Sequence, residues 1–209
     1  MVKQPSPIQI TKKKLLVVEG NDEKIFFEEL FKHMAKENIT DILDVGGKDN
    51  FKNSIPALTR ISSFNDVEAI AVVRDADDSF LSAFDSVKGI LKENGLLPPG
   101  KPGEFSQGNR KVGIFIMPDN KNSGMLEDLC LGTVKDEEGM ECVNRFIHCA
   151  NQLENPPKDK DIAKVKVQGF LAIKPGVVAK VGLGAQKRYW DFDSATLEPL
   201  RNFLSELVT

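Results

Sequence analysis

Four short runs of apolar residues alternate with stretches in which apolar residues recur every three or four positions. An unbroken apolar run is typical of a strand that is buried on both faces of a parallel sheet, and the longer spacing is typical of a helix that covers such a sheet. This alternation predicts an α/β fold with a mostly parallel sheet flanked by helices. The predicted strands lie near residues 15–19, 42–45, 69–74 and 112–117.

Helical spacing follows each of the first three predicted strands. Asn21 or Asp22 is placed to cap the first of these helices. Residues 97–109 contain three prolines and three glycines, which indicates a loop before the fourth strand. The predicted helices cover residues 26–34, 51–61 and 80–91.

The pattern changes after residue 120. Helical spacing dominates residues 125–134, 138–153 and 195–207, and only weak strand candidates remain elsewhere. We therefore expect residues 1–120 to form the α/β core and residues 121–209 to form a helical extension packed on that core, the whole making one structural domain.

Composition narrows the classes of protein that fit. Lys and Arg number 28 against 31 Asp and Glu, so the net charge is -3, and the overall field repels phosphate. That balance disfavours a general nucleic-acid binder, but it is compatible with an acidic site that metal ions neutralise.

The cysteines and the N-terminal sequence indicate the cellular compartment of the protein. The three cysteines include no CxxC pair, and Cys142 and Cys149 lie seven apart in a helical pattern, which favours buried, reduced thiols. Residues 1–14 lack the apolar core of a secretory signal, and no apolar run reaches membrane length. The sequence therefore predicts a cytoplasmic protein without a membrane segment.

Carboxylates follow two of the predicted strands. Glu19 ends the first strand, Asp75 and Asp77 end the third, and Glu23 lies one helical turn after Glu19. If the first and third strands are neighbours, their carboxyl ends meet at one crevice, where ligands of such sheets bind. Several crowded carboxylates repel one another, and a divalent cation such as Mg²⁺ relieves that repulsion. The sequence therefore predicts a metal site suited to phosphoryl transfer.

The stretches "VVEGNDEK" and "AVVRDADD" resemble the TOPRIM domain of topoisomerases, primases and OLD-family nucleases. That domain has a glutamate after its first strand and an Asp-x-Asp after its third, and the resemblance covers roughly residues 14–120. It implies a TOPRIM-like, Rossmann-like core in which Glu19 is a general acid or base. It also implies that Asp75 and Asp77 bind Mg²⁺ or Mn²⁺, with Glu23 as a further acidic residue.

Three more stretches, "DVGGKDNF", "SGMLEDL" and "GAQKRYWDFD", resemble a branch of small stand-alone TOPRIM-like proteins akin to OLD-type nucleases. In this resemblance Lys187 corresponds to a late catalytic lysine of OLD-type nucleases. The chain lacks the GxxxxGK[ST] pattern of the ATPase that larger relatives carry. An ATPase function would therefore have to come from a partner protein.

Simpler interpretations stand beside these. Acids after a strand often cap the next helix, which is the simpler interpretation of Glu19, Asp75 and Asp77. Surface solvation and helix capping account for Asp119 and Asp128. Glu127 fits either a second-metal ligand or a solvated surface acid. The turn at residues 46–48, Gly-Gly-Lys, fits either a phosphate contact or a tight turn. Residues 187–190 mix basic and aromatic side chains, which suits either a nucleic-acid strand or a tail folded over the core.

Two function hypotheses follow. The first is a metal-dependent enzyme that cleaves phosphodiester bonds in DNA or RNA, with Glu19 and Lys187 as catalytic residues. Its metal ligands would be Glu19, Glu23, Asp75, Asp77 and Glu127. The second is a non-catalytic module that binds metal or nucleotide and acts through a partner protein.

Overall fold

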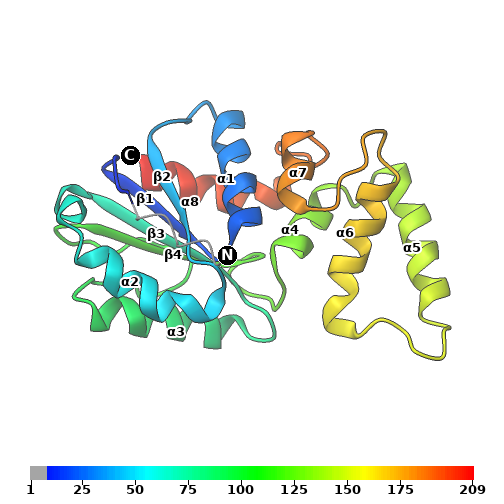
Figure 1. The fold of residues 1–209 in the computed structure, drawn as a ribbon, viewed down its shortest axis with the longest axis horizontal. Coiled ribbons are helices and arrows are strands. Elements are labelled where there is room, and N and C mark those ends of the chain that lie inside the picture. The colour runs from blue at the N-terminus through cyan, green and yellow to red at the C-terminus, as the bar shows by residue number, and fades with distance from the viewer. Residues whose placement is uncertain (1–8) are drawn as a thin grey trace, which may run out of the picture.

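The sheet consists of four parallel strands in the order β2-β1-β3-β4 (Figure 1). The structure is a computed structural model that describes residues 9–209. All four predicted strands are confirmed to within a few residues, and so is the adjacency of the first and third. Their bounds are β1 Lys14–Val18, β2 Thr40–Asp44, β3 Ala69–Asp75 and β4 Lys111–Met117.

Eight α-helices cover or extend this sheet in the described part of the chain. Their bounds are α1 Asn21–His33, α2 Phe51–Thr59, α3 Phe80–Glu93, α4 Leu126–Thr133, α5 Glu138–Ala150, α6 Ile162–Ala172, α7 Val181–Gln186 and α8 Glu198–Val208. Among residues 9–209, none of the helices has the length and apolar character needed to span a bilayer. Residues 1–8, which belong to the segment predicted to lack a secretory signal, lie outside the described residues.

Both faces of the sheet are covered at β1, β3 and β4, which explains the long apolar runs in these strands, whereas the edge strand β2 is only half-buried and contains Thr40, Asp41 and Asp44. Along β3, Ala71 and Val73 pack with α1 and α8, whereas Ile70 and Val72 pack with α2 and α3. Successive side chains of a strand point to opposite faces, so both sets must be apolar. Burying one such Val or Ile contributes about 1.5–3 kcal/mol. Figure 1 shows the two helical layers on either side of the sheet.

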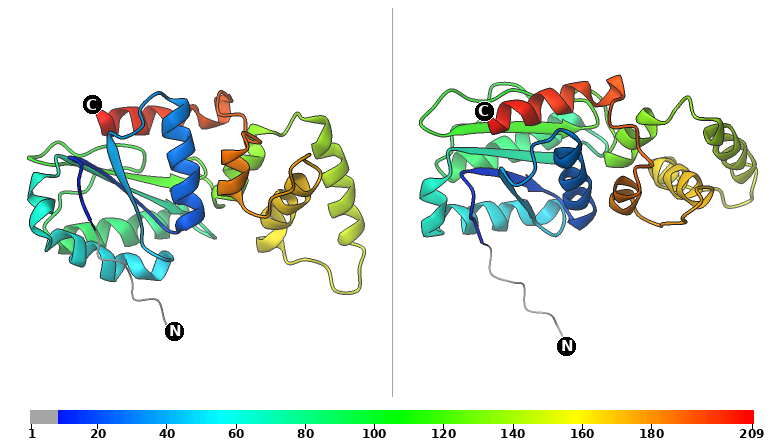
Figure 2. Two further views of the ribbon diagram at one scale, coloured as in Figure 1. Left: turned by 45° about the horizontal axis from the view of Figure 1, so that its top comes forward. Right: turned by 90° about the horizontal axis from the view of Figure 1, so that it is seen from above.

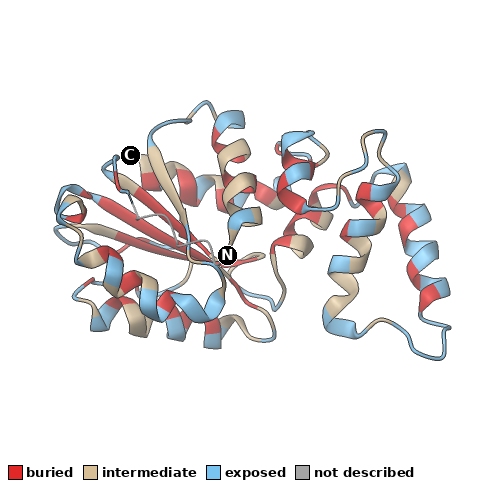
Figure 3. Cartoon of the chain, in the orientation of Figure 1, coloured by how far each residue is buried: buried red, intermediate tan, exposed pale blue. Residues whose placement is uncertain are grey.

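Helices α5 and α6 form a hairpin beside the sheet and not on either of its faces (Figures 1 and 2). Much of the outer surface of this hairpin is exposed (Figure 3). The prediction of buried thiols holds for Cys130 but is wrong for Cys142 and Cys149, which are both exposed. Their spacing of seven residues places both on one side of α5, and that side faces outward, whereas Val143 and Ile147 fill the buried side.

The weak strand candidates after residue 155 are helices. Residues 162–168 alternate apolar and polar side chains in the manner of a strand, yet they form the first part of α6. The short helix α7 was also missed, because two of its six residues are glycines. Helix α8 then returns to the sheet and packs on β3 and β4. Residues 121–209 therefore supply both the hairpin and one layer over the sheet.

Candidate functional site

The sheet reverses its strand order at β1. From β1 the chain first reaches β2 on one side and then β3 on the other, so the switch point lies between β1 and β3. Glu19 directly follows β1, and Asp75 is the last residue of β3. The backbone N–H of Asp75 donates to Oε1 of Glu19 at 3.2 Å. The two carboxylates thus meet at the crevice in which this class of sheet binds ligands.

Glu19 is largely buried, with 13% of its side chain exposed. Burial raises its pKa to about 7, and the nearby charges of Asp77 and Glu23 act in the same direction. The hydrogen bond from Asp75 and the positive charge of Arg74 lower the pKa and only partly offset the burial. The guanidinium Nε of Arg74 lies 3.7 Å from Oε1 of Glu19. The proton of Glu19 is therefore gained and lost near neutral pH.

Asp75 is the most deeply buried acid of the site, with 9% of the residue exposed. Its Oδ1 accepts a hydrogen bond from the backbone N–H of Leu126, at the start of α4, at 2.9 Å. A helix N-terminus stabilises an anion. Burial nevertheless raises the pKa of Asp75 well above its ordinary value, and the charges of Glu19, Glu23 and Glu127 raise it further.

Glu23 and Glu127 join the same group from α1 and α4. Both are half-buried, and burial raises the pKa of each carboxyl. The charge of Lys164, on α6, partly offsets the shift at Glu127. The structure therefore brings four predicted ligands into one electrostatically coupled group: Glu19, Glu23, Asp75 and Glu127. All four offer carboxylate oxygens, which are the ligands that Mg²⁺ and Mn²⁺ prefer.

Asp77 lies beside this group but is held by other contacts. Its backbone pairs with Gly124 through two hydrogen bonds of 2.9 and 2.8 Å, and its φ of +49° is unusual for a residue with a side chain. Its Oδ2 accepts a hydrogen bond from Nζ of Lys48 at 2.7 Å. Strained backbone of this kind often marks a functional site.

The Gly-Gly-Lys sequence that follows β2 forms a tight turn. Gly46 and Gly47 have φ values of +76° and +120°, which side chains rarely adopt. The N–H of Gly47 donates to the carbonyl of Glu19 at 2.7 Å, so the turn is fixed to the end of β1. The turn interpretation is thus confirmed, and the turn carries Lys48 to Asp77.

No three His, Cys, Asp or Glu side chains within residues 9–209 form a ready-made metal site. The contacts above give the physical reason. Asp77 is paired with Lys48, and one oxygen of Asp75 is occupied by the N–H of Leu126. The donor chemistry fits a hard divalent cation, but binding one requires these side chains to exchange partners.

Asp22 does not cap its own helix, because Gly20 is the N-cap of α1. Instead, the carboxylate of Asp22 accepts hydrogen bonds from the backbone N–H groups of Val181 and Gly182, at 3.1 and 2.8 Å. Those two residues begin α7, so Asp22 joins α7 to α1 beside the site.

Lys187 lies at the other end of α7 and is exposed. Within residues 9–209 its side chain has no ion pair or hydrogen bond, so the structure does not bring it into contact with the acidic group. The aromatic residues after it are structural: Nε1 of Trp190 donates to the carbonyl of Val181 at 2.9 Å, and the hydroxyl of Tyr189 bonds to Gly176. The tail interpretation holds for these two side chains.

Asp119 and Asp128 have structural roles. Asp119 accepts hydrogen bonds from the backbone of Lys121 and Asn122, and Asp128 accepts one from the N–H of Met125 at the start of α4. The capping interpretation is therefore confirmed for Asp128, whereas Asp119 closes a turn before α4 and caps no helix.

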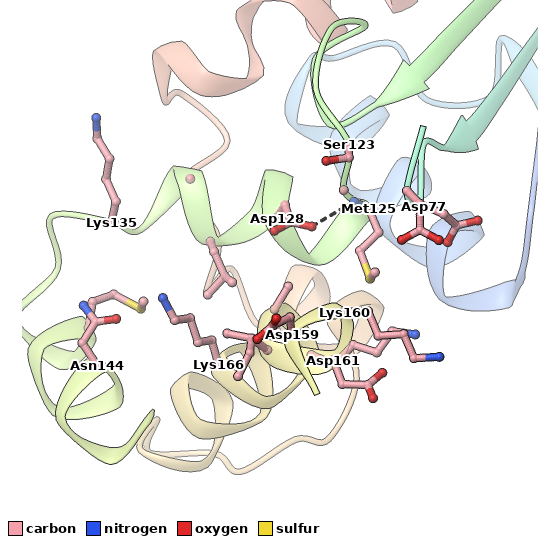
Figure 4. Close-up of a pocket in the computed structure, with 18 of the residues that line it drawn as sticks. Asp77, Ser123, Met125, Asp128, Lys135, Asn144, Asp159, Lys160, Asp161 and Lys166 are labelled. Atoms are coloured by element: carbon pink, nitrogen blue, oxygen red, sulfur yellow. Dashed lines mark hydrogen bonds between the residues drawn. The ribbon is translucent and has the colours of Figure 1, made fainter. Parts of the chain in front are cut away.

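A groove of about 980 Å³ opens beside Asp77, between α4 and the α5–α6 hairpin (Figure 4). Five lysines and five aspartates line it, so its charge is balanced and not strongly basic. The lysines are Lys48, Lys135, Lys160, Lys164 and Lys166. Figure 4 shows Lys160 and Asp161 on the side of the groove nearest Asp77.

Three residues of the site could not have been found by the search for acids at strand ends. Arg74 lies within β3, directly before Asp75, and is identified only by its contact with Glu19. Lys164 and Asp22 reach the site from α6 and α1, and no sequence pattern marks either. The glycine pair before Lys48 did mark this residue in the sequence, but nothing in the sequence identified Asp77 as the partner of Lys48.

Residues 13–209 match a protein family described as "Protein of unknown function (DUF3226)". No curated protein matches the chain.

Three solved structures of the C-terminal region of the OLD protein of Xanthomonas campestris pv. campestris, phased with mercury, platinum and iodine, resemble the chain. They share 12%, 11% and 13% sequence identity, with TM-scores of 0.48, 0.44 and 0.44. The matches cover 94% of this chain and 96%, 94% and 96% of those chains. Similarity at this level carries no argument about activity, so the TOPRIM resemblance of the motifs stays a prediction.

Proposed function

The chain belongs to the DUF3226 family of proteins of unknown function, and we propose that it is a divalent-metal-dependent enzyme that cleaves phosphodiester bonds in nucleic acid. One observation carries the proposal: buried, mutually repelling carboxylates meet at the switch point between β1 and β3. Isolated buried charges are costly, and a bound divalent cation would offset that cost.

The proposed ligands are Asp75, Glu23 and Glu127, with Asp77 joining when it leaves Lys48. Bound Mg²⁺ or Mn²⁺ would stabilise the negative charge that develops on the phosphate. The lysines of the groove would hold neighbouring phosphates of the strand, because a charge-balanced groove still offers local cationic contacts.

Glu19 is the proposed general acid or base. A group that transfers a proton works best when its pKa lies near the working pH, and burial brings the pKa of Glu19 to about 7. Arg74, 3.7 Å away, would stabilise the ionised form when the proton leaves. Lys187 remains a proposed catalytic residue only by resemblance, and it would need to move toward the acids.

The test is incubation of the purified protein with plasmid DNA and single-stranded RNA in the presence of Mn²⁺. Glu19→Gln should lower the cleavage rate by about 10²–10⁴-fold even at saturating metal, because an amide cannot transfer the proton. Asp75→Asn should abolish the Mn²⁺-dependent cleavage. The matched control is Asp85→Asn, an exposed acid on α3. Cleavage by Glu19→Gln at the wild-type rate would remove the catalytic role of Glu19.

A second candidate is a non-catalytic module that binds metal or nucleotide and acts through a partner, for example an ATPase. One observation favours it: the carboxylate of Asp77, an acid of the TOPRIM-like motif, is engaged by Lys48 and has to exchange partners before it can hold a catalytic metal. This candidate predicts Mn²⁺ binding by the wild type without cleavage of any tested nucleic acid. Addition of the partner would then be required for activity.

A further inference from the structure

Lys48 lies where the acidic group and the groove meet. Its Nζ is 2.7 Å from Oδ2 of Asp77, and its side chain also lines the groove. The two side chains are 48% and 34% exposed. An ion pair that water reaches this freely contributes at most about 1 kcal/mol. Lys48 can therefore leave Asp77 at little cost.

The backbone, and not the ion pair, fixes the positions of both partners. The Gly46-Gly47 turn is bound to the carbonyl of Glu19 at 2.7 Å, which places the start of the Lys48 side chain. The two hydrogen bonds to Gly124 place Asp77. When the pair opens, Asp77 stays at the site and Lys48 stays tethered beside it.

The ammonium group remains charged in this position. Its hydrogen bond and its charge interaction with Asp77 raise the pKa of Lys48, and the charge of Glu19 raises it further. Lys48 is thus a cation in the field of two proposed functional carboxylates. An ammonium group has three donors and no acceptor, so a phosphate oxygen is a natural second partner.

Building on the proposed function, we infer that Lys48 is a displaceable counter-ion of the site. In the metal-free protein it pairs with Asp77. When a divalent cation takes that carboxylate, the ammonium group turns to a phosphate of the nucleic-acid strand in the groove. One lysine therefore competes with the metal and assists the substrate.

The first test is calorimetric titration of the full chain with Mn²⁺. Lys48→Met should bind Mn²⁺ about two- to five-fold more tightly than the wild type, because the competing cation is gone. Lys52→Met, at a nearby exposed lysine on α2, should leave the affinity unchanged. In the Asp77→Asn background, Lys48→Met should have no effect. Unchanged or weaker Mn²⁺ binding by Lys48→Met would overturn the inference.

The second test measures binding of a short single-stranded phosphorothioate oligonucleotide, which resists cleavage, at saturating Mn²⁺. Lys48→Met should bind it about three- to ten-fold more weakly, the opposite direction to the metal effect. Oligonucleotide binding equal to the wild type would also overturn the inference.

These two readouts separate the inference from the proposed function. If the wild type binds Mn²⁺ and the oligonucleotide but Lys48→Met changes neither affinity, only the role of Lys48 fails. If the wild type binds neither ligand, the proposed function fails, and the role of Lys48 fails with it. Circular dichroism of Lys48→Met confirms that any change does not come from unfolding.

Discussion

The surroundings of Glu19 shift the pKa of its carboxyl group in opposite directions. Burial and the neighbouring carboxylates favour the neutral acid, whereas the N–H of Asp75 and the charge of Arg74 favour the anion. Burial wins, and the pKa rises from 4.5 to about 7. The folded protein therefore binds more protons than the unfolded chain between these two values, and its free energy of unfolding falls as the pH rises through them.

This linkage predicts the pH dependence of stability. In the presence of a metal chelator, the free energy of unfolding of the wild type should be lower at about pH 8 than at about pH 5. Glu19 should account for about 2–4 kcal/mol of this difference. Glu19→Gln should reduce the fall by that amount, because an amide does not titrate. Urea unfolding at a series of pH values measures it, with Glu104→Gln as the exposed control. Parallel pH profiles for Glu19→Gln and the wild type would contradict the burial argument.

The burial of Asp75, the most deeply buried acid of the site, leads to a separate prediction about stability. At about pH 8 without metal, Asp75→Asn should be more stable than the wild type by about 1–3 kcal/mol, since the amide oxygen can still accept from Leu126 without a buried charge. Mn²⁺ should raise the melting temperature of the wild type by several degrees and leave that of Asp75→Asn unchanged. Scanning calorimetry measures both effects. An equal Mn²⁺ shift in the two proteins would exclude Asp75 as a ligand.

At the level of elements, α1, which carries Glu23, packs closely against α7 beside the acidic group. A Cβ at Gly182 would lie 2.8 Å from the backbone oxygen of Asp22 and 2.8 Å from Cβ of Ile25. Only glycine permits this approach, and the approach lets the start of α7 donate to Asp22.

Gly182→Ala should therefore separate the two helices. We expect a loss of about 1–3 kcal/mol in the free energy of unfolding and weaker Mn²⁺ binding, because the backbone of Asp22 cannot give way as a flexible side chain could. Gly89→Ala on α3, where a Cβ meets nothing within 4 Å, should instead stabilise by about 0.5–1 kcal/mol. Chemical denaturation compares them, and a neutral Gly182→Ala would contradict the close packing.

The helices and strands also show which parts of the fold and of the site could be predicted from the sequence. The sheet was predictable because β1, β3 and β4 are covered on both faces and therefore carry continuous apolar runs. The meeting of Glu19 and Asp75 followed from strand adjacency alone. Helix α6 was not predictable, because its stripe of buried residues, such as Phe170 and Leu171, sits at the end of an alternating segment. The Lys48–Asp77 pair was not predictable either, since it depends on the shape of two turns.

For the whole molecule, the proposed binding of a nucleic-acid strand in the groove beside the hairpin predicts a dependence on salt. Replacing Lys135, Lys160 and Lys166 with Gln should weaken single-strand binding and reduce its log–log salt slope by about 2, if each lysine contacts one phosphate. Mn²⁺ affinity should not change. The control replaces Lys52, Lys92 and Lys101, which are exposed elsewhere, with the same change in net charge. Equal salt slopes for the two triple variants would show that the strand does not use the groove.

The bond between Asp22 and Gly182 joins residues that are 160 positions apart. A ribosome makes the chain from the N-terminus, so all four strands exist long before α7 and α8 do. During that interval one face of the sheet lacks the cover of α8, and Asp22 lacks its donors. Contacts between such distant segments form late and slow the completion of a fold. A nascent or prematurely ended chain therefore carries the acids without the finished site, and the site should be complete only after synthesis of the chain has nearly ended.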